Sequence, residues 1–216
     1  MTPTLDSGRL PNLIRDDLWL FPPNRDTKGG SSWFLKLPCG AVLIDCPPIS
    51  EATFSFLKEH SQGIDTHMIL SGRDGHGRLP LLMKRFSWPV FVQEQEHYLL
   101  PGLEGLLPFG QHLTTDFGID LHWMPGPSPG SAVVLVASVN LLFCGHLLTP
   151  LAPGRIGPIR TSRTFHWTRQ QSSLQVLRSL VSSHPSLQLA SGAPLGALRG
   201  VPLVPLSGWL CPDKSF

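Results

Sequence analysis

Four short loops constrain this chain most, because each is rich in glycine, proline, serine or histidine and each follows an apolar, strand-like run. In chain order they are residues 71–77 (SGRDGHG), 125–131 (PGPSPGS), 143–146 (FCGH) and 191–194 (SGAP). Loops at strand ends carry binding and catalytic residues more often than the strands themselves do. The order and setting of these four loops are therefore the main guide to both fold and function.

The first half of the chain predicts a hairpin and a helix. Residues 33–37 and 41–45 are apolar runs separated by Pro-Cys-Gly, which is typical of a β-hairpin. Ser50 is a suitable N-cap for a helix that extends toward Gly63. This order of elements indicates a sheet with a helix packed beside it.

A parallel βαβ unit follows. Residues 68–70 and 89–92 are short strand candidates. The segment 79–86 between them places Leu79, Leu82, Met83 and Phe86 on one helical face. A strand, a helix and a strand within so short a segment predict two parallel neighbours in one sheet.

The second half predicts antiparallel strands, then one helix and one strand. The strand candidates are residues 119–123, 132–136 and 140–143. A helix containing Leu174 to Val181 ends before Pro185, and residues 187–190 form the last predicted strand. Residues 192–216 are expected to be irregular or weakly helical. Together the elements predict an α/β (α+β) fold with two mixed sheets packed face to face, helices outside, and a single domain over residues 1–216.

Composition excludes several classes of protein. The chain has 216 residues, 41% hydrophobic and 15% charged, with a net charge of +2 and no basic run, so we expect no nucleic-acid partner. We expect no signal peptide and no membrane association, because no apolar run approaches the roughly 20 residues of a membrane helix. Four cysteines without a C-x-x-C pair predict packed thiols in a cytoplasmic protein.

In order and context, the four loops resemble the metal-bearing loops of the metallo-β-lactamase fold, which implies a four-layer αββα sandwich. The first motif of that family, His-x-His-x-Asp-His after a buried strand, corresponds here to Gly72, Asp74, His76 and Gly77. The next three ligand positions correspond to Pro127, His146 and Ala193.

Further segments resemble a cyanobacterial and plant branch of this superfamily, whose members often depart from the ligand pattern. These segments are residues 21–30, 43–47, 93–101 and 145–147, and the similarity extends from about residue 16 to about residue 200.

The resemblance implies the fold but argues against two-metal hydrolysis. Zinc requires three or four nitrogen, sulfur or carboxylate donors. Gly72, Gly77, Pro127 and Ala193 provide no side-chain donor. We therefore expect no metal cofactor and no enzymatic turnover, and predict a hydrolase-like pseudoenzyme that binds a small molecule or a protein partner. A structural or assembly protein is a further alternative.

A rebuilt single-metal hydrolase is the other alternative. Asp74, His76 and His146 are donors at ligand positions, and three donors plus water could hold one Zn or Fe/Mn ion. Otherwise Asp74 caps a turn or pairs with Arg73 or Arg78, and both histidines have ordinary structural roles.

Basic side chains near these loops are candidates for binding a ligand in the cleft. In related proteins the segment around residues 160–169 runs across the cleft mouth. Its candidates for an anionic ligand, together with the first-loop arginine, are Arg73, Arg163, His166 and Arg169. Ser71 or Ser128 as a nucleophile would need a positioned base, and Cys144 is expected to be a packed thiol.

Overall fold

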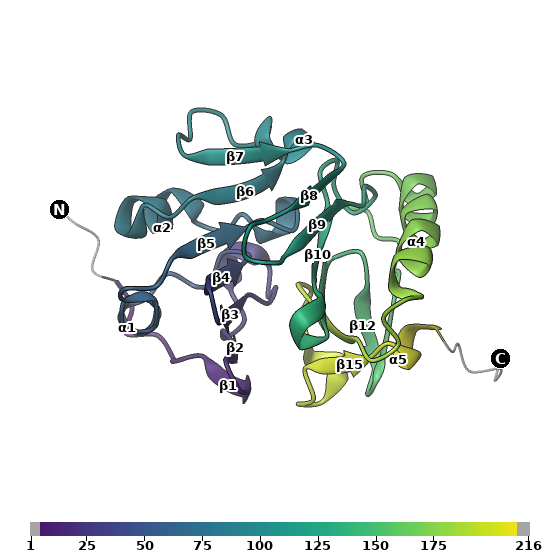
Figure 1. Ribbon diagram of the computed structural model, residues 1–216, viewed down its shortest axis with the longest axis horizontal. Helices are drawn as coiled ribbons and strands as arrows, with labels where there is room; N and C mark the ends of the chain where they lie inside the picture. The colour runs from purple at the N-terminus through teal and green to yellow at the C-terminus, as the bar shows by residue number, and fades with distance from the viewer. Residues whose placement is uncertain (1–4, 211–216) are drawn as a thin grey trace.

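The computed structural model describes residues 5–210 and contains two β-sheets packed face to face (Figure 1). The first sheet joins antiparallel strands at one side to parallel strands at the other. In spatial order its strands are β1 (Asn12–Arg15), β2 (Leu18–Leu20), β3 (Trp33–Leu37), β4 (Gly40–Ile44), β5 (Thr66–Ile69), β6 (Val90–Gln93) and β7 (Leu106–Phe109). The predicted hairpin (β3–β4) and the parallel βαβ unit (β5–α2–β6) are both confirmed.

The second sheet is also mixed. It runs in the order β15 (Leu203–Pro205), β14 (Gln188–Ser191), β11 (Leu141–Gly145), β10 (Ala132–Val136), β9 (Asp120–Trp123) and β8 (His112–Thr114). The predicted antiparallel strands are β9, β10 and β11. A separate hairpin pairs β12 (Thr149–Ala152) with β13 (Arg155–Gly157).

Helices cover the outer faces of both sheets (Figure 1). The α-helices are α1 (Glu51–Ser61), α2 (Leu79–Phe86), α3 (Glu94–His97), α4 (Trp167–Val181) and α5 (Ser207–Leu210). Short 3-10 turns are η1 (Arg25–Thr27), η2 (Arg73–Gly75), η3 (Ala137–Val139) and η4 (Gly196–Leu198). Ser50 caps α1 as predicted, accepting a hydrogen bond from the Thr53 N–H.

None of the helices within residues 5–210 combines the length and apolar character required to cross a membrane.

One apolar core lies between the two sheets. The rings of Trp33 from β3 and Phe143 from β11 meet edge to face at 6.1 Å, and both side chains are almost fully buried. The Trp33 indole N–H donates to the Ser191 carbonyl at 3.0 Å, so the two sheets are also joined beside the loop that follows β14. Helix, sheet, sheet and helix form the four-layer αββα sandwich that the sequence predicts.

The predictions for the C-terminal region and for the sheet edges need correction. Residues 187–190 are not the last strand, because β15 pairs antiparallel with β14 beyond the Pro/Gly-rich stretch. The tail is therefore more ordered than predicted up to Leu210. Local sequence patterns did not predict β1, β2, β7, β8 or the β12–β13 hairpin, all of whose strands are only three or four residues long. Cys211 and the rest of the tail lie outside the described residues.

Candidate functional site

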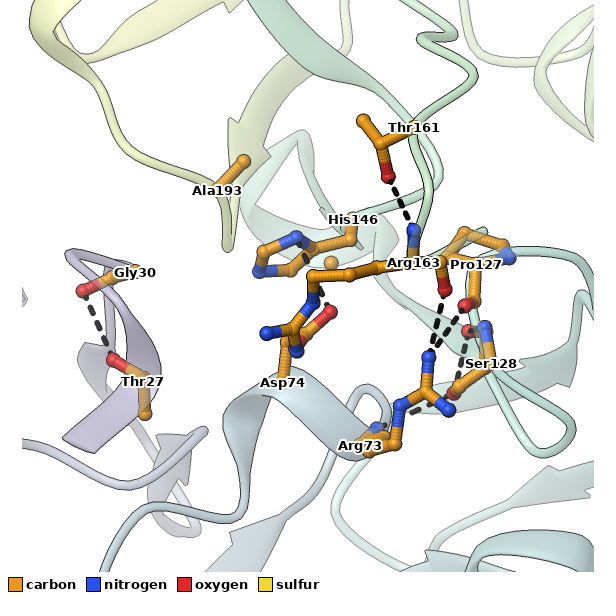
Figure 2. Close-up of polar contacts among 12 residues, drawn as sticks. Thr27, Gly30, Arg73, Asp74, Pro127, Ser128, His146, Thr161, Arg163 and Ala193 are labelled. Carbon is orange, nitrogen blue, oxygen red and sulfur yellow. Dashed lines mark hydrogen bonds and ion pairs between the residues drawn. The ribbon is translucent and has the colours of Figure 1, made fainter. Parts of the chain in front are cut away.

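The four loops meet at one end of the sandwich and are joined by backbone hydrogen bonds. The Ala132 N–H donates to the Ser71 carbonyl at 2.9 Å, which joins the first and second loops. The Gly192 N–H donates to the Gly145 carbonyl at 2.9 Å, which joins the third and fourth loops. Figure 2 shows side chains from all four loops around one central region.

Asp74 is at the centre of this region, where η2 presents its carboxylate to two other loops. The Arg163 guanidinium donates from Nη2 to Asp74 Oδ1 (Figure 2). The other carboxylate oxygen of Asp74 lies 3.8 Å from Nδ1 of His146. A cationic side chain of the chain itself therefore occupies the place beside Asp74 and neutralises its charge.

The structure does not show the pairing of Asp74 with Arg73 or Arg78 that the sequence left open. Asp74 pairs with Arg163 and not with Arg73 or Arg78. Arg73 Nη2 instead donates to the Arg163 carbonyl at 2.8 Å, which holds the 160–164 segment over the first loop. Arg78 pairs with Asp26 at 3.0 Å. Local sequence could not reveal this, because Arg163 is 89 residues from Asp74.

His146 is a neutral ring at physiological pH. Burial lowers the pKa of His146 to about 4, and a hydrogen bond with the Gly192 backbone only partly opposes this effect. The ring therefore adds no positive charge beside Asp74 above about pH 5.

His76 faces away from Asp74 and toward a buried carboxylate. Its Nε2 lies 3.2 Å from Oε2 of Glu96, whose side chain is fully buried. The other oxygen of Glu96 accepts hydrogen bonds from the Ser128 hydroxyl and, at 2.8 Å, from the Gly130 N–H. Burial alone would raise the pKa of Glu96, but the contacts with His76, Ser128 and Gly130 outweigh it and lower the pKa. Glu96 thereby connects the first and second loops.

A second buried carboxylate, that of Asp45, is hydrogen-bonded to the start of the first loop. Asp45 follows β4 and accepts hydrogen bonds from the Ser71 N–H at 2.8 Å and the Ser71 hydroxyl at 2.6 Å. Burial raises the pKa of Asp45 to about 6, although these hydrogen bonds act in the opposite direction. Ser71 and Ser128 each donate their hydroxyl proton to a buried carboxylate, and these hydrogen bonds hold the first and second loops in place.

Two of the positions that correspond to family ligands have little space for a side chain and offer no donor. Gly72 has φ +155°, and a Cβ there would lie 3.0 Å from the Ser128 hydroxyl oxygen. Gly77 has φ +47°, and a Cβ there would lie 2.8 Å from the Cβ of Cys46. A histidine at either position would need a strained backbone and displaced neighbours.

The residues present do not fit a two-metal centre. Pro127 and Ala193 are both buried and offer no side-chain donor. Asp74 and His146 lie side by side, but His76 is directed to Glu96 instead of joining them. Within residues 5–210, no three His, Cys, Asp or Glu side chains are grouped so that they could hold a metal ion.

A cleft of about 230 Å³ opens beside the Asp74–Arg163 pair. Its lining residues come from η1 and the residue after it, the four loops, the start of β12, the 159–164 segment and α4: Thr27, Lys28, Asp74, Pro127, His146, Thr149, Ile159, Thr161, Arg163, Thr164, Gln170, Ala193 and Pro194. The 159–164 segment therefore borders the cleft, as the resemblance implies.

Of the four basic candidates, only Arg163 lines this cleft. His166 caps α4 by accepting the Arg169 N–H at its Nδ1, and both side chains are exposed. Cys144 is a buried thiol, and burial raises its pKa to about 12, so it is a packed residue and not a nucleophile.

The sequence analysis missed four residues of this region. Asp45 and Glu96 lie in segments that carry the family resemblance, and that was the available signal for them. Lys28 lies in another of these segments, residues 21–30, and occupies a left-handed turn after η1. Gln170 had no such signal, because it lies inside an ordinary helical pattern.

Comparisons with known proteins identify the fold. No protein-family profile matches this sequence, and no curated protein matches it either. Solved structures do match. A DIM-1 metallo-β-lactamase exposed to ceftazidime superposes with a TM-score of 0.66 and 15% identity, covering 91% of this chain and 94% of that chain.

Two other similar structures are not described as β-lactamases. TTHA1623, solved in a di-iron-bound form, gives a TM-score of 0.61 and 20% identity over 76% of this chain and 87% of that chain. An archaeal metallo-β-lactamase superfamily protein from Sulfolobus tokodaii gives a TM-score of 0.60 and 18% identity over 82% and 79% of the two chains. The chain therefore has the metallo-β-lactamase fold, and at this level of identity the fold alone is established.

Proposed function

We propose that this chain is a hydrolase-like pseudoenzyme, which has lost the dinuclear site and metal-dependent hydrolysis of its fold and binds a ligand or partner through the remaining cleft. The observation that carries this proposal is the Asp74–Arg163 ion pair at the meeting point of the four loops. A metal ion at Asp74 would have to displace a guanidinium that already satisfies the carboxylate.

The buried networks support the same proposal. In a two-metal protein, coordination joins loops from several strands. Here Glu96 joins the His76 ring to Ser128 and Gly130, and Asp45 holds Ser71. These contacts give the loops a connection that involves no metal, which supports the proposal.

A cytoplasmic site of action belongs to the same proposal. Cys39, Cys46 and Cys144 are free thiols, which suits a reducing compartment.

Metal content and turnover test the proposal together. Protein purified without chelator and without added metal is expected to contain less than about a tenth of an equivalent of zinc, iron or manganese by elemental analysis. It is also expected to hydrolyse no member of an ester, thioester and phosphodiester panel. Two equivalents of metal, or turnover that a chelator abolishes, would contradict the proposal.

A rebuilt single-metal hydrolase is the second candidate, because Asp74 and His146 remain adjacent. It predicts one equivalent of metal that is lost in Asp74→Asn and in His146→Asn. The assembly-protein alternative predicts instead that Asp74, His76 and His146 can all be changed to alanine without loss of function.

A further inference from the structure

The cleft beside Arg163 has walls that are positively charged overall. Lys28 contributes one positive charge from the turn after η1, and Arg163 contributes another from the 159–164 segment. Asp74 contributes one negative charge. Two positive charges and one negative charge leave a net charge of +1, which favours an anionic ligand.

Two residues that line the cleft also have side-chain atoms without a hydrogen-bond partner among the described residues. Nη1 of Arg163 is a buried donor without a hydrogen-bond partner. Gln170 lines the cleft, is 1% exposed, and donates from Nε2 to the Leu147 carbonyl at 3.2 Å, which fixes the orientation of its amide. Its Oε1 is then a buried acceptor without a partner. A buried polar group without a partner is unfavourable, so a ligand that pairs both groups gains affinity.

Two threonines supply further donors at the cleft wall. The Thr161 hydroxyl oxygen accepts the Arg163 N–H at 3.2 Å, and the Thr164 hydroxyl oxygen accepts the Thr161 N–H at 2.9 Å. Each hydroxyl therefore retains its own proton for donation. Both residues line the cleft, and Figure 2 shows Thr161 on the other side of Asp74 and His146 from Thr27.

The size of the cleft limits the ligand. Its volume of about 230 Å³ is below the roughly 300–1,000 Å³ of sites for drug-sized molecules. A small metabolite fits this volume.

We propose that this cleft binds a small organic anion, a carboxylate or a phosphate monoester, that also carries a hydroxyl or amino group. The anionic group lies between Lys28 and Arg163, and the hydroxyl or amino group donates to Gln170 Oε1. The proposal rests on the proposed function, because it names the ligand class of the same cleft.

Calorimetric titration of the full chain with matched probes tests this assignment. The carboxylate pair is lactate and propionate, and the phosphate pair is glycerol 3-phosphate and propyl phosphate. The hydroxylated member of at least one pair is expected to bind at least about tenfold tighter than its partner, because only it satisfies the Gln170 acceptor. The pair that shows the binding identifies the anionic group.

Variants separate recognition from structural damage. Arg163→Gln is expected to weaken binding by about tenfold or more, and Lys28→Gln by about threefold, while Arg160→Gln removes a charge from the same segment outside the cleft and leaves affinity unchanged. Asp74→Asn breaks the same ion pair as Arg163→Gln, but it removes the negative charge from the cleft. The affinity for the anionic probes is therefore expected to stay the same or to rise. Gln170→Leu is expected to abolish the preference for the hydroxylated probe, with circular dichroism verifying its fold.

Two results would overturn the inference. One is that none of the four probes binds to folded protein, and the other is that Arg160→Gln weakens binding as much as Arg163→Gln does. Metal analysis of the same sample distinguishes the two proposals, because a metal-free protein that ignores these anions contradicts only the ligand class. A metal-loaded protein contradicts the proposed function itself.

Discussion

Asp45 and His146 are expected to affect stability in opposite directions as the pH falls. The folded chain holds Asp45 with a pKa of about 6, above its ordinary value of 3.8, so the folded state takes up a proton before the unfolded state does. This contribution raises the free energy of unfolding as the pH falls from about 6 toward 3.8. His146 has a pKa of about 4, below its ordinary value of 6.5, so the unfolded state takes up its proton first. That contribution lowers the free energy of unfolding as the pH falls from about 6.5 toward 4.

The two contributions nearly cancel between pH 6.5 and pH 5. Proton linkage with these pKa values gives a gain of about 1 kcal/mol from Asp45 and a loss of about 1.5 kcal/mol from His146. We therefore expect these two groups together to change the free energy of unfolding of the natural chain only slightly over this interval. Asp45→Asn removes the gain, so its stability should fall by about 1.5 kcal/mol over this interval. His146→Asn removes the loss, so its stability should rise by about 1 kcal/mol.

Urea unfolding at pH 6.5 and pH 5.0, followed by tryptophan fluorescence, measures these differences. All other titrating groups are common to the three proteins, so the difference between each variant and the natural chain isolates one residue. Parallel pH dependence in Asp45→Asn and the natural chain would refute the reasoning for Asp45. The same result for His146→Asn would refute it for the histidine.

Three further predictions concern the loops. Glu96→Ala is expected to lower the free energy of unfolding by about 3–5 kcal/mol, or roughly 6–20 °C in Tm. Glu96→Gln is expected to lower it by less, since the glutamine keeps one acceptor. Equal thermal melts for the natural chain and both variants would contradict the role of the carboxylate. Gly77→Ala is expected to cost more than Gly63→Ala, because both glycines have positive φ but only Gly77 lacks space for a Cβ; the two are compared by urea unfolding, and equal losses would count against the closed position. The double variant Pro127→His, Ala193→His is expected to bind fewer than two zinc ions per chain, as measured by elemental analysis. Two bound zinc ions would show that the other ligand positions are open to metal.

The long and regular elements of the fold could be predicted from sequence, because their patterns are local. The apolar face of residues 79–86, the Ser50 cap and the turn at residues 38–40 each specify one element through neighbouring residues. Strand β15 could not be predicted in this way. Its three residues follow a Pro/Gly-rich stretch and depend on pairing with β14, which local patterns do not encode.

The sequence predicts which side-chain donors are absent from the candidate site, but not which side chains contact one another there. Comparison with the family motifs assigns Gly72, Gly77, Pro127 and Ala193 to ligand positions, and the absence of a donor there is visible in the sequence. The pairing of Asp74 with Arg163, and of His76 with Glu96, depends on side chains brought together from distant segments. A histidine at a ligand position could equally well coordinate a metal or contact a buried carboxylate, and only the three-dimensional arrangement distinguishes the two.

Anomalous diffraction from crystals of the full chain soaked in zinc tests the central claim most directly, namely that side chains of this protein have replaced the ions of the fold. The expected map shows no zinc peak near Asp74 and His146, with the Arg163 guanidinium still against the carboxylate. Two peaks about 3.5–4 Å apart in that place, with Arg163 displaced, would contradict it.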